Sequence, residues 1–166
     1  MIANLDWAGS YDTIVFEGCD GAGKTTLAEA TAQNINASLI HSTLTPPGTD
    51  LVTTYHCLLQ RAGRLVFDRC FLSELVYGPL YRGHTRLTYQ NMDTLVRHVV
   101  ARNGIFVHVT APAGVIRQRL AARGEQHLPD LDEIKLVCGR YDELFRAVRT
   151  MAKVLLITTD HPDEDT

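Results

Sequence analysis

Short apolar runs alternate with longer amphipathic runs along most of the chain. The short runs are bounded by polar residues or glycine, and most contain β-branched residues, so they predict strands at Thr13–Glu17, Ser38–His41, Arg64–Asp68, Ile105–Thr110 and Val154–Thr158. The longer runs predict helices at Lys24–Asn34, Asp50–Arg61, Leu72–Tyr77, Tyr89–Arg102, Ala113–Arg123 and Leu131–Met151. This alternation predicts an α/β fold, in which a parallel sheet is covered by helices on both faces.

The last predicted helix has the clearest periodicity. Its apolar residues recur at steps of three and four, as one buried helix face requires: Ile134, Val137, Cys138, Tyr141, Leu144, Phe145 and Val148. Two helix starts carry suitable N-cap residues, which are Thr88 before Tyr89 and Asp130 before Leu131.

Length and composition favour one ordinary globular domain over residues 1–166. The 166 residues are 45% hydrophobic and 21% charged, with a net charge of −3. No apolar run is long enough to cross a membrane, and Met1–Asp12 lacks the basic start of a secretory signal, so we expect a cytoplasmic protein. The four cysteines show no C-x-x-C spacing and are expected to be reduced thiols. The seven histidines show no metal-ligand spacing.

The segment after the first predicted strand matches a phosphate-binding loop. Residues 18–25 read G-C-D-G-A-G-K-T, and the strand before them and helix after them supply the expected context. Glycines let several backbone N–H groups converge on an anion, and the N-terminus of the helix adds positive potential. We expect Lys24 to contact the β- and γ-phosphates and Thr25 to ligate Mg²⁺. The residues expected around the phosphates of ATP are Asp20, Gly21, Ala22, Gly23, Lys24, Thr25 and Thr26.

A second candidate group follows the third predicted strand. Asp68 ends this apolar strand and should face the phosphate loop, where a carboxylate can hold Mg²⁺ through water or accept a proton. Arg69 can bind a phosphate with two N–H groups. Asp68 could instead serve as a helix N-cap, and Arg69 could form a structural ion pair.

Together these motifs resemble the thymidylate kinase family. Residues 16–27 read F-E-G-C-D-G-A-G-K-T-T-L and closely resemble the family's opening, F-E-G-x-D-G-x-G-K-T-T. Asp68-Arg69 with Ser73 and Tyr77 resembles its D-R-[YFH]-x-x-S-x-x-x-Y block. Weaker similarities link residues 45–49 to its E-P-G-G-T loop, 111–125 to the helix entering its lid and 154–160 to its last strand. The resemblance covers most of residues 12–160.

This resemblance implies a P-loop kinase that uses ATP and Mg²⁺ to phosphorylate a nucleotide-like acceptor. It also implies a five-stranded parallel sheet of order 2-3-1-4-5, a short lid over about residues 119–130, and a homodimer. The family takes an additional arginine from either its phosphate loop or its lid. Because the loop position here is Ala22, we expect Arg119 and Arg123 of the lid to act in catalysis with Lys24, Asp68 and Arg69. Asp20 would face the acceptor sugar, and Arg69, Ser73 and Tyr77 would also contact the acceptor.

The chain departs from thymidylate kinases around the acceptor. Residues 50–67 form a shorter segment than in that family, where the corresponding helices wall the thymine. The added segment 78–87 interleaves aromatic residues with Arg82 and Arg86, which suits an acceptor base and phosphate, or a nucleic-acid strand. An ordinary polar connection is the alternative reading of this segment.

Several functions therefore stay open. A phage-type deoxynucleoside monophosphate kinase, acting on a pyrimidine nucleotide such as dTMP, is the leading hypothesis. A kinase acting on 5-hydroxymethyluracil within DNA is the second, although the net charge of −3 argues against a polymer. A deoxynucleoside kinase and a non-catalytic nucleotide-binding switch are the others. The acidic residues 160–166 predict a short disordered end.

Overall fold

The fold is a five-stranded parallel sheet between two layers of helices. The structure, a computed structural model, describes residues 4–159. The strand order is β2-β3-β1-β4-β5, as expected, and all neighbouring pairs run parallel. The strands are β1 (Thr13–Glu17), β2 (Ser38–His41), β3 (Leu65–Asp68), β4 (Gly104–Thr110) and β5 (Val154–Thr158).

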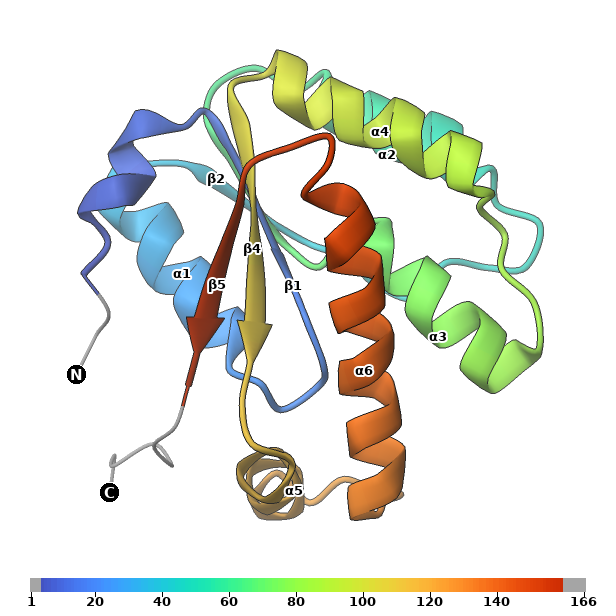
Figure 1. The fold of residues 1–166 in the computed structure, drawn as a ribbon. Coiled ribbons are helices and arrows are strands. Elements are labelled where there is room, and N and C mark those ends of the chain that lie inside the picture. The colour runs from blue at the N-terminus through green and yellow to red at the C-terminus, as the bar shows by residue number, and fades with distance from the viewer. Residues whose placement is uncertain (1–3, 160–166) are drawn as a thin grey trace.

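The helices divide unequally between the two faces of the sheet (Figure 1). They are α1 (Lys24–Ile35), α2 (Leu51–Leu59), α3 (Leu72–Arg82), α4 (Tyr89–Ala101), α5 (Ala113–Ala122) and α6 (Leu131–Val148). On one face, Ile14 and Phe16 of β1 join a core with α1. On the other, Val15 joins a core with α2, α3, α4 and α6. The alternation along β1 thus buries both sides of the strand, as a central parallel strand requires.

The strand register brings the predicted chemistry to one edge. Asp68 pairs with Phe16 of β1 on one side and with His41 of β2 on the other, while Glu17 pairs with His108 of β4. The phosphate loop leaves β1 at this same carboxyl edge, and α5 lies just beyond it (Figure 1). Ligands of open α/β sheets bind at such an edge, so the fold places the site there.

Both predicted N-caps are confirmed. The Thr88 hydroxyl accepts the backbone N–H of Asn91, and the Asn91 side-chain oxygen accepts the backbone N–H of Thr88. Asp130 and Glu133 make the same reciprocal arrangement at the start of α6. Such capping boxes satisfy N–H groups that the helix itself leaves unpaired.

Most predicted boundaries agree with the structure to within two residues, and the larger differences lie in α3, in α6 and before β1. α3 runs to Arg82 rather than Tyr77, so much of the expected 78–87 connection is helical. α3 continues through Pro79 although proline cannot donate the helical hydrogen bond to Leu75, and the helix ends before Gly83, which has φ +74°. α6 ends at Val148, and an unpredicted 3₁₀ turn, η1 (Asp6–Ser10), precedes β1. The predicted disordered end, 160–166, lies outside the described residues.

Within residues 4–159, no helix has both the length and the apolar composition needed to cross a bilayer.

Candidate active site

The phosphate loop joins β1 to α1, and glycines let its backbone adopt conformations that other residues rarely reach. Gly21 and Gly23 have φ values of +80° and +95°, and Gly23 immediately precedes the first residue of α1. Side-chain-bearing residues rarely adopt these angles. The loop therefore wraps around the N-terminus of α1, where free N–H groups and the helix dipole favour an anion.

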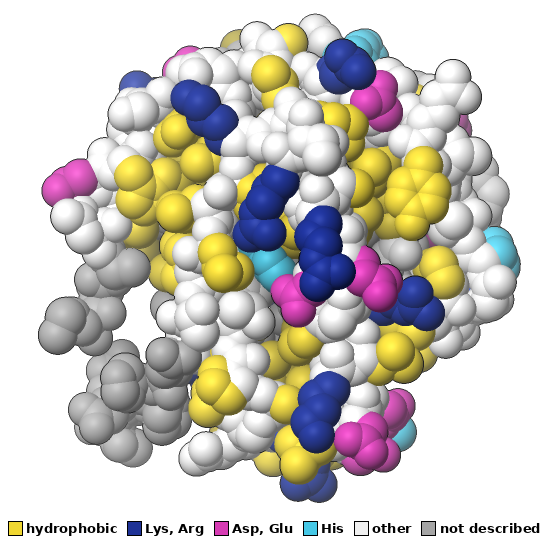
Figure 2. Space-filling view, in the orientation of Figure 1, with side chains coloured by type: hydrophobic (Ala, Val, Ile, Leu, Met, Phe, Trp, Pro, Cys, Tyr) yellow, Lys and Arg dark blue, Asp and Glu magenta, His cyan; other side chains and the backbone are white. Residues whose placement is uncertain are grey.

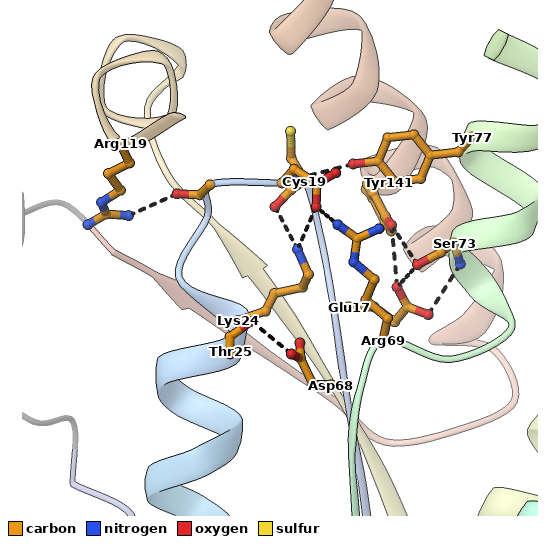
Figure 3. A network of polar contacts seen from close by, with 12 residues as sticks. Glu17, Cys19, Lys24, Thr25, Asp68, Arg69, Ser73, Tyr77, Arg119 and Tyr141 are labelled. Carbon is orange, nitrogen blue, oxygen red and sulfur yellow. Dashed lines mark hydrogen bonds and ion pairs between the residues drawn. The ribbon is translucent and has the colours of Figure 1, made fainter. Parts of the chain in front are cut away.

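Lys24 lies inside this loop (Figure 3). Its side chain is only 4% exposed, and its Nζ donates to the Cys19 carbonyl at 2.8 Å and lies 3.7 Å from Asp20 Oδ1. Burial lowers the pKa of Lys24, although the negative charge of Glu17 opposes this shift. A bound phosphate would add a negative charge to those of Asp20 and Glu17 beside this buried ammonium.

Thr25 and Asp68, both predicted to hold Mg²⁺, lie in direct contact. The Thr25 hydroxyl donates to Asp68 Oδ2 at 2.7 Å. Asp68 Oδ1 is buried and has no hydrogen-bond partner among the described residues. An unpaired buried carboxylate oxygen is costly unless a ligand or water satisfies it. These two residues therefore fit Mg²⁺ with its coordinated waters.

Arg69 reaches the same region from a strained backbone position. It has φ +65°, an angle uncommon for a residue with a side chain, and its N–H donates to the Phe16 carbonyl at 3.0 Å. Its guanidinium forms an ion pair with Asp20 and lies 5.5 Å from the ring centre of Tyr77. The sharp turn after β3 thus directs Arg69 toward the phosphate loop.

A buried carboxylate, Glu17, holds that turn in place. Its Oε1 accepts the backbone N–H groups of Cys70 and Ser73 at 2.8 and 3.2 Å. Its Oε2 accepts the hydroxyls of Ser73 and Tyr141 at 2.6 and 3.3 Å (Figure 3). Burial raises the pKa of Glu17, while these hydrogen bonds oppose the shift. Glu17 therefore links β1, α3 and α6 directly behind the candidate site.

A cavity of about 480 Å³ opens beside the phosphate loop. Its lining combines the loop with residues of α2, α3, α6 and the connections between them, namely Cys19, Asp20, Ser42, Thr43, Leu44, Thr45, Leu51, Tyr55, Arg69, Cys70, Ser73, Glu74, Tyr77, Tyr81, Arg82, Arg86, Leu120, Glu125, His127, Pro129, Glu133, Ile134 and Val137. All six residues predicted to contact the acceptor are in this set. The volume lies within the range of small-molecule sites.

The predicted acceptor residues differ in their contacts. Ser73 is already bound to Glu17, and the Tyr77 hydroxyl accepts the N–H of Asp20 at 3.1 Å. Arg82 and Arg86 both pair with the buried carboxylate of Glu74. Direct contact of these four side chains with an acceptor stays a prediction.

The two lid arginines occupy different positions. Arg123 is exposed at the end of α5, and its positive charge contributes to the lowered pKa of Lys24. Arg119 is buried instead, and its Nη1 donates to Thr159 Oγ1 at 2.8 Å and to the Gly21 carbonyl at 3.4 Å. In Figure 3 it lies on the outer side of the loop, away from Lys24. Arg119 therefore braces the loop here, and its catalytic role stays a prediction.

Sequence reasoning missed His41 and the structural role of Glu17. His41 ends β2, and its Nδ1 lies 3.0 Å from Asp68 Oδ2. Its position at a strand end beside β3 was a usable signal, since carboxyl ends of parallel strands meet at one edge. Glu17 was visible as a charged residue ending an apolar strand. Its partner Tyr141 gave no such signal, because it belongs to the apolar face of the last helix.

All four cysteines are free thiols. Contact with Cys138 and burial raise the pKa of Cys19, and burial raises that of Cys70. Both therefore stay protonated and pack as small apolar side chains. Among the described residues, no group of three or more histidine, cysteine or acidic side chains could hold a metal ion.

The comparisons with known proteins identify the fold. No family model matches the chain, and no curated protein matches it in sequence. Solved structures do match. YorR protein from Bacillus subtilis, in complex with phosphorylated GDP, is 23% identical with a TM-score of 0.71, over 89% of this chain and 85% of that one.

Two further structures have the same architecture. Deoxyadenosine kinase from M. mycoides with bound dCTP is 12% identical, with a TM-score of 0.60, over 88% of this chain and 89% of that one. Shikimate kinase from Acinetobacter baumannii in complex with shikimate is 16% identical, with a TM-score of 0.58, over 95% and 89%. The expected P-loop kinase fold is thereby confirmed, whereas a specific relation to thymidylate kinases is not shown.

Proposed function

We propose that this protein is a kinase that transfers the γ-phosphoryl group of ATP to a nucleotide-like acceptor, with a pyrimidine deoxynucleoside monophosphate as the first candidate. The observation that supports this most is that the phosphate loop and the cavity share residues. Cys19 and Asp20 belong to the phosphate loop and also line the cavity, and Arg69 joins them there. A donor phosphate in the loop would thus adjoin an acceptor in the cavity, as phosphoryl transfer requires.

The residues suit positioning and charge neutralisation. Lys24 and the loop N–H groups would hold the β- and γ-phosphates, while Thr25 and Asp68 would hold Mg²⁺, which neutralises phosphate charge when bound. An acceptor oxygen would form a bond to the γ-phosphorus as the bond to the bridging oxygen of ADP breaks. Arg69 and Arg123 can stabilise the negative charge on the transferring group.

The acceptor is best described as a single nucleotide unit. A cavity of about 480 Å³ has room for one nucleotide, so a DNA acceptor would need to present a nucleotide flipped from its helix. On the face drawn in Figure 2, basic side chains are scattered, with acidic ones beside several of them. This distribution favours a free nucleotide over a polymer.

A deoxynucleoside kinase is the second candidate. A neutral hydroxyl acceptor must lose a proton, and the Asp20 carboxylate lines the cavity where it could accept one. A solved deoxyadenosine kinase has the same fold, so this fold is compatible with a nucleoside acceptor.

An ADP-release assay tests these proposals. The purified protein is given ATP and Mg²⁺ with each deoxynucleoside monophosphate, each deoxynucleoside, and DNA containing 5-hydroxymethyluracil. We expect turnover with a pyrimidine monophosphate, and a loss of about 10²-fold in kcat for Asp68→Asn. Turnover of nucleosides alone would favour the second candidate. If the protein binds ATP but forms no ADP with any of these acceptors, it is a nucleotide-binding switch and the proposal is contradicted.

A further inference from the structure

Glu74 is a buried carboxylate of α3 that lines the cavity. Its side chain is 7% exposed and pairs with the guanidinium groups of both Arg82 and Arg86. The backbone N–H of Arg86 also donates to Oε1 at 2.8 Å. Although burial raises it, hydrogen bonds from these arginines lower the pKa of Glu74 below its ordinary value. The Glu74 carboxylate is therefore charged, and both of its oxygens accept hydrogen bonds from Arg82 or Arg86.

Arg86 extends this contact to another segment. Its Nη2 donates to Glu74 Oε2 at 2.9 Å, while its Nη1 donates to the carbonyls of Thr45 and Pro46 at 3.3 and 3.2 Å. A planar guanidinium can make these bonds simultaneously, whereas an ammonium cannot match their geometry. One arginine thus ties α3 to the connection between β2 and α2.

That connection, residues 42–49, has few other anchors. At its start, Ser42 donates through its N–H to the Asp68 carbonyl at 3.1 Å and through Oγ to the Arg69 carbonyl at 2.9 Å. Thr49 Oγ1 donates to Pro46 within the segment itself. Leu44 is 99% exposed although it lines the cavity. The conformation of this wall therefore depends on Arg86 more than on apolar packing.

Gly78 makes the arrangement possible. A Cβ atom there would lie 2.9 Å from Arg82 Nη2 and 3.0 Å from Glu74 Oε1. Both distances are shorter than normal contacts of a Cβ atom, so the glycine leaves the space that the ion pair occupies.

We propose that Glu74 and Arg86 are positioning residues that hold segment 42–49 as a wall of the acceptor site. This inference rests on the proposed function. Neither residue contacts the phosphate loop in the structure: Glu74 pairs with Arg82 and Arg86, and Arg86 otherwise contacts the carbonyls of Thr45 and Pro46. They act through the segment that they hold and set how tightly the acceptor binds.

Steady-state kinetics of Glu74→Gln and Arg86→Lys test this role. We expect the KM for the acceptor to rise about tenfold or more, while kcat and the KM for ATP stay within about twofold. Arg97→Ala is the matched control, because Arg97 forms a comparable but exposed pair with Asp93 on α4, and it should change none of these values. Melting temperatures establish that each variant is folded. An unchanged acceptor KM, or equal losses in kcat and in both KM values, would overturn the proposal.

Hydrogen exchange separates this inference from the proposed function. Amides of residues 42–49 should exchange faster in Glu74→Gln and Arg86→Lys than in the wild type. In the control Arg97→Ala they should exchange at the wild-type rate. If the wild type phosphorylates no acceptor but exchange accelerates, the structural link stands and the proposed function fails. Unchanged exchange at these amides would refute the link whatever the activity.

Discussion

The donor half and the acceptor half of the candidate site are constructed in different ways. The donor half is one continuous segment, Gly18–Thr25, whose shape depends on backbone angles and on the start of α1. The acceptor half is assembled from side chains of several distant segments, joined through buried carboxylates such as Glu17 and Glu74. The loop has outside contacts as well, since Arg119 and Thr159 donate to its carbonyls, but the acceptor wall consists almost entirely of such long-range contacts.

Two carboxylates at adjacent strand ends illustrate the difference. Glu17 ends β1 with both oxygens hydrogen-bonded to protein. Asp68 ends β3 with one oxygen bound to Thr25 and the other without a partner among residues 4–159. A satisfied carboxylate stabilises the fold, while an unsatisfied one is available to a ligand.

Breaking the donor half should have the largest effect. Lys24→Ala removes the cation that we propose contacts the β- and γ-phosphates, so kcat should fall about 10³-fold. The lost hydrogen bond to Cys19 opposes the relief of burying this charge, so the melting temperature should change little compared with the loss of activity. Lys135→Ala, an exposed lysine on α6, is the control and should keep full activity. Full ADP release by Lys24→Ala would contradict the assignment of the donor site.

Removing the Glu17 carboxylate, which joins β1 to α3 and α6, should mainly lower the stability of the fold. Glu17→Ala leaves two backbone N–H groups and two hydroxyls without their acceptor, and should lower the free energy of unfolding by about 3 kcal/mol. Glu17→Gln keeps one carbonyl acceptor for the N–H groups and offers an N–H₂ to the hydroxyls, so its loss should be about 1 kcal/mol or less. Urea unfolding of both variants measures the difference. Equal losses would show that shape rather than hydrogen bonding matters here.

The acceptor half should also be the more sensitive to acid. His108 of β4 is buried and stacks on Phe145 of α6 at 4.3 Å, and burial lowers its pKa to about 4, with partial opposition from Asp142. The unfolded chain, with an ordinary histidine pKa, then binds the proton more tightly than the folded one. Stability is therefore complete above about pH 6.5 and falls toward pH 4, by about 2 kcal/mol between pH 7 and pH 5.

His108→Phe tests this link. Phenylalanine keeps an aromatic ring against α6 but cannot gain a proton, so unfolding curves at pH 7 and pH 5 should differ less than in the wild type. An identical acid loss in the variant would assign the effect to other groups. Since α6 supplies Ile134 and Val137 to the cavity, acid should weaken acceptor binding along with stability.

The smallest expected effect is on kcat in a variant of Arg123, which tests whether this residue belongs to the donor half. Arg123→Ala should lower kcat about tenfold, because its charge lies close enough to Lys24 to influence the same phosphates. Arg117→Ala, on the same helix and exposed, should leave kcat unchanged. ADP release under saturating substrates measures both. Equal effects of the two variants would indicate a general electrostatic contribution from α5.

Local patterns in the sequence were enough for the strands, the phosphate loop and the caps at Thr88 and Asp130. Each depends on residues within a few positions of one another, so hydrophobic periodicity and residue type suffice to predict it. The position of Asp68 followed as well, because parallel strands end at a common edge.

Only the tertiary structure decided the long-range contacts that assemble the acceptor half and brace the donor loop. The pairing of Glu17 with Tyr141, the bracing of the loop by Arg119, and the hold of Arg86 on Thr45 and Pro46 join residues far apart in the chain. The continuation of α3 through Pro79 likewise follows from its surroundings rather than from local propensity. A single sequence specifies which groups exist locally, but burial and long-range packing select the partner that each buried charge finds.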